Sequence, residues 1–153
     1  MIIKNSLHKA LIDTIETKKT LIYLEKDIEK SIKAIFKCIS NKGKVFFCGN
    51  GGSAADAQHL TAELLIRLRP RVNRDPIPAI CLAMDTSTLT ACGNDYDFNK
   101  IFSRPFQALA NRKDILFVIS TSGNSKNILE VLRLAKKKKY SIYWFIRFKR
   151  WIS

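Results

Sequence analysis

The order of its segments constrains the fold of this chain more than any other feature. Two short apolar runs, residues 44–48 and 114–119, each lead into a loop of small polar residues, 49–53 and 120–125, and then into a helical pattern. Strands that are apolar on both faces are typical of a parallel sheet with helices on either side. The sequence therefore predicts an α/β fold with three layers, in which a central parallel sheet lies between helices.

The neighbouring segments extend this pattern. A third apolar run at residues 80–83 precedes Asp85, which can accept a hydrogen bond as the N-cap of a short helix through Cys92. We expect the helix after the first polar loop to span residues 54–68, because the Arg–Pro pair at positions 69 and 70 closes it.

Residues 1–40 have the spacing of amphipathic helices. Leu7, Leu11 and Ile15 recur four residues apart, and a second apolar series follows a polar break at residues 17–20. We expect packing helices here, and we expect the sheet domain to begin at residue 41.

The formal net charge of +14 raises the question of a nucleic-acid partner, but its distribution argues against one. Residues 136–153 hold seven Lys and Arg side chains and no acidic residue, so half of the net charge lies in this tail. No apolar run approaches the roughly 18 to 20 residues that span a membrane. The N-terminus lacks a signal-peptide pattern, and the four cysteines form no CxxC pair. We expect a cytoplasmic protein with no nucleic-acid partner and no membrane partner.

The loop at 120–125 has the composition of a phosphate site. Its hydroxyl groups come from Ser120, Thr121, Ser122 and Ser125, and Gly123 allows the backbone to approach a ligand. Hydroxyls and free N–H groups at the start of a helix bind phosphate. No lysine follows in the Walker pattern, so a sugar phosphate fits better than a nucleoside triphosphate. The alternative is a serine-rich helix cap without a ligand.

The glycine-rich loop at 49–53 is less specific alone, but the helix after it carries His59 and Glu63. Residues four apart lie on one helix face, so these two side chains can meet one metal ion or one substrate. The alternative is an ordinary surface pair. Asn94 and Asp95 offer further polar groups, or form an ordinary turn.

Taken together, these segments resemble the phosphoheptose isomerases of the SIS (sugar isomerase) fold. The residues that carry the resemblance are FCGNGGSAADAQH at 47–59, AEL at 62–64, GND at 93–95, FSR at 102–104 and ISTSGNS at 119–125. The resemblance runs from about the second helix to Ala135, and it implies a SIS domain over residues 41–135 that is incomplete at its C-terminal end.

The resemblance implies an activity, the conversion of sedoheptulose 7-phosphate to D-glycero-D-manno-heptose 7-phosphate, a heptose precursor for lipopolysaccharide or capsule. It also implies that the chain forms a homotetramer through helices such as those of residues 1–40, with active sites between subunits. The resemblance also implies a role for each site residue. The sugar is contacted by Asn50, Gly51, Gly52, Asn94 and Asp95, and the phosphate is held by Ser120, Thr121, Ser122 and Ser125. One zinc ion per subunit is bound by His59 and Glu63, and Glu63 also contacts the substrate as the catalytic base.

Two other functions use similar segments. The first is binding of the replication initiator by a non-enzymatic SIS protein, and the second is that the chain is a sugar-phosphate-sensing domain. Neither needs a base, so Glu63 favours the isomerase.

The chain departs from the family pattern after Ala135. Family members continue with further strands and a helix that carries a glutamine and a second histidine of the active site, whereas residues 136–153 form a basic aromatic tail. We expect a frameshift at the lysine run, because reading one base later turns the TGG codons of Trp144 and Trp151 into glycine codons. The chain as given is then impaired, and resequencing this DNA tests the hypothesis. The alternative is a genuine tail that binds membrane or nucleic acid.

Overall fold

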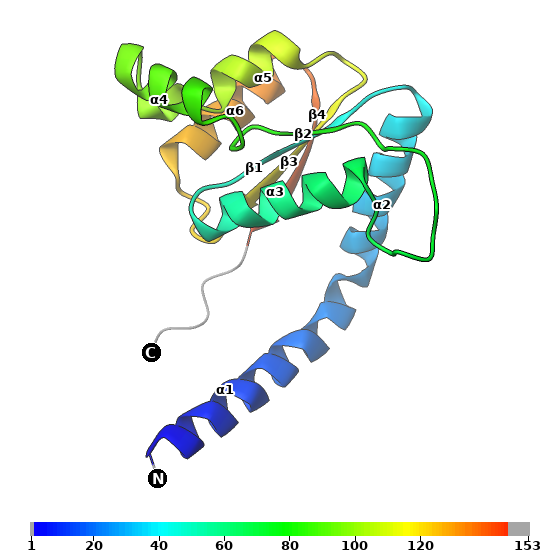
Figure 1. Cartoon of the computed structure of the whole chain (residues 1–153), viewed down its shortest axis with the longest axis vertical. Helices are drawn as coiled ribbons and strands as arrows, with labels where there is room; N and C mark the ends of the chain where they lie inside the picture. The colour runs from blue at the N-terminus through cyan, green and yellow to red at the C-terminus, as the bar shows by residue number, and fades with distance from the viewer. Residues whose placement is uncertain (1, 147–153) are drawn as a thin grey trace. The chain divides into compact units, whose positions relative to one another are not determined.

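Helices form the N-terminal part of the chain, as the spacing predicts. The computed structural model describes residues 2–146, with side chains for residues 6–143, and it divides the chain into two compact units, Met1–Ala34 and Ile35–Ser153. Helix α1 (Ile2–Lys19) is followed by the 3₁₀ helix η1 (Thr20–Leu24) and by α2 (Glu25–Ser40) (Figure 1). The change from α to 3₁₀ geometry falls at the polar break.

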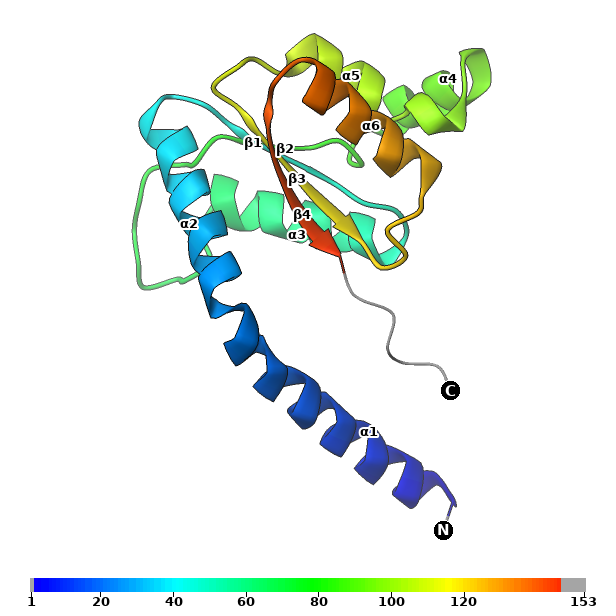
Figure 2. The same ribbon diagram turned by 180° about the vertical axis from the view of Figure 1, so that it is seen from behind.

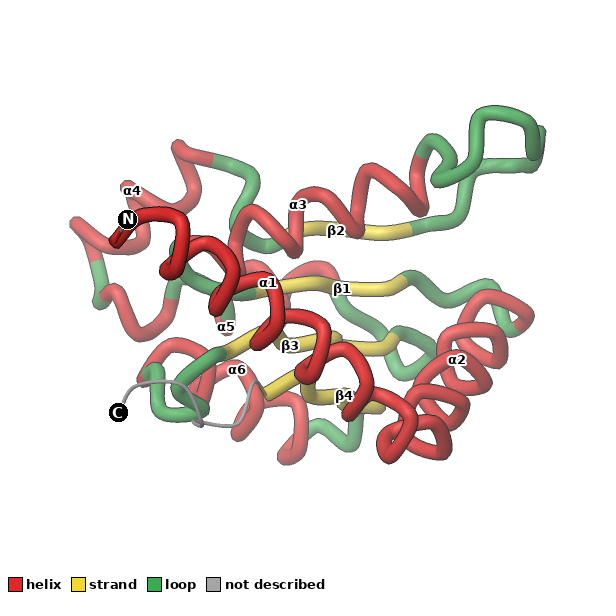
Figure 3. The backbone as a smooth tube through the Cα atoms, turned by 90° about the horizontal axis from the view of Figure 1, so that it is seen from below, coloured by secondary structure: helices red, strands yellow, loops and turns green. Residues whose placement is uncertain are grey.

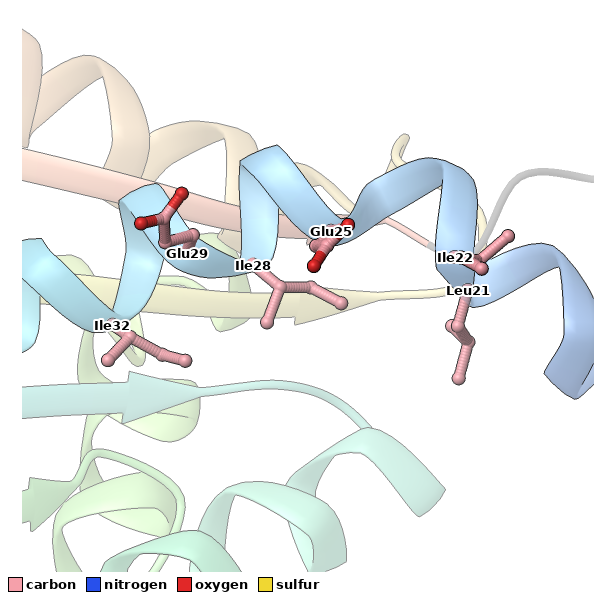
Figure 4. A pocket seen from close by; sticks show the side chains of 6 residues that line it. All are labelled: Leu21, Ile22, Glu25, Ile28, Glu29 and Ile32. Atoms are coloured by element: carbon pink, nitrogen blue, oxygen red, sulfur yellow. The ribbon is translucent and has the colours of Figure 1, made fainter.

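The first unit exposes a series of apolar side chains. Leu21, Ile28 and Ile32 are 45%, 38% and 61% exposed. Their side chains project from the same side of the segment, whereas that of Glu29 projects from the opposite side (Figure 4). Helices with such a face are stable when a further surface covers it.

The second unit is built on a four-stranded sheet, in which every pairing between neighbours is parallel. Its order is β2-β1-β3-β4, and Figure 3 shows the strands side by side. The strands are β1 (Val45–Cys48), β2 (Ala79–Cys81), β3 (Ile115–Ser120) and β4 (Ser141–Ile146). Val45 lies opposite both Ala79 and Ile115, so these three strands start in register.

Helices cover both faces of this sheet, which confirms the predicted three-layer α/β fold. Helix α3 (Gly52–Leu65) lies on one face (Figures 1 and 2). The opposite face carries α4 (Thr86–Asp95), the 3₁₀ helix η2 (Phe98–Lys100), α5 (Ser103–Leu109) and α6 (Lys126–Lys137). No helix within residues 2–146 is long and apolar enough to cross a membrane.

The core lies between β1, β3 and the helices of the second face. The ring of Phe106 in α5 meets the ring of Phe46 in β1 edge-on, with centroids 5.1 Å apart, and packs against Tyr140 at 5.2 Å. Ile128 and Val131 on one face of α6 are fully buried beside them. These contacts fix α6 on the sheet and thereby place the loop before it.

A buried carboxylate links the amino ends of β1 and β3. Asp114 Oδ1 accepts a hydrogen bond from the Lys44 N–H (2.9 Å), and Oδ2 accepts from Lys44 Nζ (2.7 Å) and from the Asn111 N–H (2.8 Å). The Asp114 side chain is fully buried. This link fastens the two strands at the end away from the polar loops.

Two helix boundaries differ from the predicted ones. Helix α3 ends at Leu65 rather than at residue 68, because the Leu64 carbonyl accepts hydrogen bonds from the Ile77 N–H (3.0 Å) and from Arg74 Nη1 (2.9 Å) of the returning chain. Helix α4 continues beyond Cys92 to Asp95, so the Asn94–Asp95 pair lies in its last turn rather than after it.

The first part of the basic tail belongs to the sheet. Residues Ser141–Ile146 form β4, which pairs with β3 from Ile115 opposite Ser141 to Ser120 opposite Ile146. The remaining tail residues, which include Trp151, lie outside the described residues.

Candidate active site

Two polar loops lie at the same end of the sheet, where β1 and β3 end. The first leads from β1 into α3, and the second leads from β3 into α6 (Figure 2). In open α/β sheets, ligands bind beyond the carboxyl ends of the strands. The structure therefore brings the two predicted loops together at the expected place.

The glycine loop needs glycine at two positions for different reasons. Gly51, the N-cap of α3, has φ 55° and ψ −123°, a conformation that residues with a side chain rarely adopt. A Cβ atom on Gly49 would lie 2.5 Å from the Ser53 carbonyl oxygen. At Gly52, by contrast, a Cβ atom would meet no atom of the described chain within 4 Å, so open space borders this residue.

The serine loop is ordered partly by its own hydroxyls. Ser120 Oγ accepts a hydrogen bond from the Gly123 N–H (3.0 Å), and Ser122 Oγ accepts one from the Asn124 N–H (3.2 Å). Ser125 is the N-cap of α6, yet its side chain makes no capping hydrogen bond. The predicted alternative of a simple serine cap therefore does not describe Ser125, whose hydroxyl remains available beside the helix N-terminus.

His59 and Glu63 face each other on α3. Nε2 of His59 lies 3.6 Å from Oε1 of Glu63, which is longer than a normal hydrogen bond. The His59 side chain is 71% exposed and that of Glu63 is 25% exposed. Oε2 of Glu63 is buried and has no hydrogen-bond partner in the described chain. Buried carboxylate oxygens are normally paired, so this one can accept a hydrogen bond from a bound molecule.

The C-terminal end of α3 is held by an arginine that the sequence analysis did not single out. The guanidinium of Arg74 donates to the carbonyl oxygens of Glu63 and Leu64. These contacts satisfy carbonyl groups at the helix end and fix the turn that carries Glu63.

Asn94 and Asp95 are exposed in the last turn of α4, where Asn94 Nδ2 donates to Asp95 Oδ1 (2.8 Å). Within the described residues, no hydrogen bond or ion pair joins them to either polar loop or to Glu63. Their contact with a sugar stays a prediction.

Cys48 lies directly before the glycine loop but is unsuited to nucleophilic chemistry. It is fully buried, and burial raises the pKa of its thiol, with a smaller contribution from Cys81. A neutral, inaccessible thiol is a packing residue.

Asn127 is the site residue that sequence reasoning missed. Its side-chain amide and that of Asn50 exchange two hydrogen bonds of 2.9 Å and 2.8 Å, which connect the glycine loop to the first turn of α6. The available signal was an asparagine two residues after the last serine of the phosphate loop.

Comparisons with known proteins agree with this geometry. The SIS domain family matches residues 9–143. A phosphoheptose isomerase from Campylobacter concisus is 52% identical over 115 residues, which cover 75% of this chain and 60% of that protein. One from Helicobacter pylori is 46% identical over 119 residues, 78% of this chain and 61% of that protein. The chain thus spans about 60% of the length of these curated relatives.

Solved structures extend the likeness to three dimensions. A phosphoheptose isomerase from Neisseria gonorrhoeae superposes with a TM-score of 0.86 at 34% identity, covering 94% of this chain and 74% of that one. A phosphoheptose isomerase from Francisella tularensis gives a TM-score of 0.84 at 38% identity, with 93% and 73% covered. The chain belongs to the SIS domain family, and these relatives, which share its fold, are phosphoheptose isomerases.

Proposed function

We propose that this chain provides the sugar-phosphate site of a phosphoheptose isomerase, which converts sedoheptulose 7-phosphate to D-glycero-D-manno-heptose 7-phosphate. The observation that carries the proposal is the buried, unpartnered Oε2 of Glu63 on α3, the helix that begins at the glycine loop with open space at Gly52. A carboxylate in this position is what the exchange of a ketose and an aldose requires.

Glu63 acts as the base in this proposal. The reaction moves a proton from C1 to C2 of the sugar through an enediol, so one carboxylate can accept the proton and return it to the neighbouring carbon. Oε2 makes no hydrogen bond within the described chain and is free to do this. Arg74 keeps the helix turn of Glu63 in place through the main chain.

The serine loop holds the phosphate group. Thr121 and Ser122 are exposed, and the Ser125 hydroxyl makes no capping bond at the start of α6. The helix N-terminus adds a partial positive charge of about one half. Asn50, Gly51 and Gly52 would meet the sugar from the other loop, and Asn94 and Asp95 from α4.

His59 and Glu63 fit a zinc ion as part of a ligand set. Zinc accepts imidazole nitrogen and carboxylate oxygen, and two such atoms bound to one tetrahedral ion are about 3.3 Å apart, close to the 3.6 Å between Nε2 and Oε1. Within residues 6–143 no group of three metal-binding side chains occurs. When bound, zinc would polarise the sugar carbonyl.

The zinc proposal has a test that does not depend on turnover. The wild-type chain should bind zinc in competition with a chelating dye, and His59→Ala should weaken this binding, whereas His8→Ala should not. Equal zinc affinity of the wild-type chain and His59→Ala would contradict the proposed ligand.

The apolar face of residues 21–32 would serve a homo-oligomer, a tetramer in the family. Ile28→Lys places a charge on this face and should give a smaller species in sedimentation velocity. Lys30→Glu, an exposed change on the same helix, should leave the assembly unchanged. Identical sedimentation of Ile28→Lys and the wild-type chain would contradict this role.

We further propose that the product supplies heptose for lipopolysaccharide or capsule, and that the chain works in the cytoplasm. All four cysteines, Cys38, Cys48, Cys81 and Cys92, are free thiols in the structure, as is usual in a reducing compartment.

The decisive test compares Glu63→Gln with Glu130→Gln. Both changes remove one carboxylate from a helix, but Glu130 is 41% exposed and pairs with Arg133 on α6. Binding of sedoheptulose 7-phosphate is measured by calorimetry, and turnover by formation of the aldose. Glu63→Gln should bind within about threefold of wild type and lose turnover by 10²-fold or more, whereas Glu130→Gln should match wild type.

Two outcomes would contradict the predictions. Absence of sedoheptulose 7-phosphate binding by the wild-type chain, or measurable turnover that is equal in the wild-type chain and in Glu63→Gln, would overturn the proposed function. Turnover at the rate of a full-length relative would instead overturn the expectation that the chain as given is impaired.

A further inference from the structure

The side chains of Asn50 and Asn127 form a reciprocal amide pair. Asn50 Nδ2 donates to Asn127 Oδ1 (2.9 Å), and Asn127 Nδ2 donates to Asn50 Oδ1 (2.8 Å). Asn127 is 3% exposed, and its Oδ1 also accepts from the Ile128 N–H (2.9 Å). Two residues that are 77 positions apart are thus fixed in one orientation.

Only two amides can make this pair. Each side chain must donate one N–H and offer one carbonyl oxygen, so a carboxylate, a hydroxyl or an apolar group at either position breaks at least one bond. The pair also determines which way the Asn50 amide is turned. Asn50 retains one N–H and one lone pair, and their direction is set by Asn127.

The amide pair joins the two halves of the proposed substrate site. Asn50 immediately precedes Gly51 and Gly52 at the start of α3, the helix of His59 and Glu63. Asn127 follows Ser125, the N-cap of α6, by two residues. A sugar phosphate that spans both loops requires a fixed separation between the phosphate group and the reacting carbons.

We propose that Asn127 is a positioning residue of the isomerase site, which acts through Asn50 to orient its free N–H toward the sugar and to hold the glycine loop at a fixed distance from the phosphate loop. The inference rests on the proposed function. Asn127 would contact no reacting atom, and its effect on the reaction would pass through Asn50.

The structure offers a matched control at the other end of the same two strands. Asp114 and Lys44 also link two distant parts of the chain through a buried side chain, but they do so at the amino ends of β1 and β3. A general loss of stability should follow from damage to either link. A loss of ligand affinity should follow only from damage to the amide pair.

The test uses the full 153-residue chain in three forms, wild type, Asn127→Leu and Asp114→Asn. Leucine has the same number and branching of side-chain heavy atoms as asparagine, and it adds no charge beside the phosphate loop. Dissociation constants are measured for sedoheptulose 7-phosphate well below the melting temperature of each variant, and KM and kcat are measured where turnover occurs. Exchange of the Asn50 side-chain amide protons is followed by NMR.

We expect slow exchange of one Asn50 amide proton in the wild-type chain and loss of this protection in Asn127→Leu. The same variant should bind sedoheptulose 7-phosphate about tenfold more weakly, with the change mainly in KM, as suits the loss of one oriented hydrogen bond. Asn127→Gln keeps the amide and should recover part of this affinity. Asp114→Asn should lower the melting temperature and leave the dissociation constant unchanged.

Unchanged affinity for sedoheptulose 7-phosphate in a folded Asn127→Leu chain would overturn the positioning role, as would an equal loss of affinity in Asp114→Asn. If the wild-type chain fails to bind this sugar phosphate at all, the proposed function fails, and the positioning role fails with it. The exchange measurement then still reports whether the amide pair orders Asn50.

Discussion

The two ends of the β1–β3 pair are held together in different ways. At the amino end, both oxygens of the buried Asp114 carboxylate are satisfied by Lys44 and Asn111. At the carboxyl end, the two loops are joined by one neutral amide pair between Asn50 and Asn127. Farther along α3, the helix that the Asn50 loop opens, Oε2 of Glu63 has no partner in the described chain.

This difference indicates that the amino end of the β1–β3 pair is structural and that its carboxyl end is functional. A carboxylate whose hydrogen bonds all stay within the chain stabilises the fold and offers nothing to a ligand. A loop that keeps unused donors and acceptors gives up stability, which a bound ligand can restore. Substitutions at the amino end should therefore lower stability alone, and substitutions at the carboxyl end should lower affinity more than stability.

The largest effect is expected from Asp114→Ala. The change leaves the Lys44 ammonium and two backbone N–H groups without their partner, so we expect the free energy of unfolding to fall by about 3 kcal/mol or more. Urea unfolding followed by circular dichroism measures it. Glu130→Gln, on an exposed ion pair, should cost less than about 0.5 kcal/mol. A loss below about 1 kcal/mol for Asp114→Ala would show that the amino end is not the structural end.

The glycine loop contains both kinds of position, one that should affect stability and one that should affect ligand binding, within four residues. Gly49→Ala forces a Cβ atom against the Ser53 backbone and should destabilise the chain by about 1 to 3 kcal/mol. Gly52→Ala meets open space at the first residue of α3, so stability should stay within about 0.5 kcal/mol of wild type.

Gly52→Ala should nevertheless weaken binding of sedoheptulose 7-phosphate by about tenfold or more, because the new methyl group occupies space that we assign to the sugar. Calorimetry of the folded variant decides this. Wild-type affinity in Gly52→Ala would show that the open space beside Gly52 is not used by the ligand.

A smaller effect concerns the thiols at the two ends. Burial raises the pKa of Cys38, whose Sγ lies near the Lys44 carbonyl, and the negative charge of Asp114 raises it further. Burial also raises the pKa of Cys48 at the carboxyl end, without any contribution from Asp114. Removal of the Asp114 charge should therefore lower the pKa of Cys38 only.

Alkylation at pH 8 of Asp114→Asn tests this difference. Opening of the destabilised variant exposes both thiols, so the ratio of the Cys38 rate to the Cys48 rate isolates the electrostatic part. We expect the ratio to rise by about two- to threefold, because more Cys38 is thiolate at this pH. An unchanged ratio would mean that Asp114 does not act on Cys38.

The sequence was sufficient for the features that repeat along the chain. The apolar runs at 44–48 and 114–119 predicted the two central strands, and the polar loops after them were placed correctly because parallel strands end together. The same reasoning put His59 and Glu63 on one face of a helix. These patterns are local, so hydrophobic periodicity and residue spacing predict them directly.

What the sequence could not supply depends on contacts between distant residues. The amide pair joins positions 50 and 127, and no local pattern marks either asparagine as the partner of the other. Helix α3 ends where Arg74 and Ile77 take its last carbonyl groups, so its end is set by a returning segment rather than by the Arg–Pro pair. The basic composition of the tail concealed β4, because pairing with β3 decides its structure.

The smallest effect is expected at Asp85, a polar residue near the carboxyl end that serves the chain itself. Its carboxylate accepts hydrogen bonds from the Thr88 hydroxyl and from the Ser87 N–H, and the Thr88 hydroxyl is the main cause of its lowered pKa. Because the folded pKa lies below the unfolded value, the stabilisation is present above the unfolded pKa and is lost as the pH falls through the folded pKa.

Asp85→Asn keeps a good N-cap but removes the charge, so the variant should melt slightly below wild type at pH 7, and the two melting temperatures should converge near pH 2. A difference in melting temperature that persists unchanged at acidic pH would show that shape rather than charge makes Asp85 the better cap. Affinity for sedoheptulose 7-phosphate should be the same in both chains at pH 7.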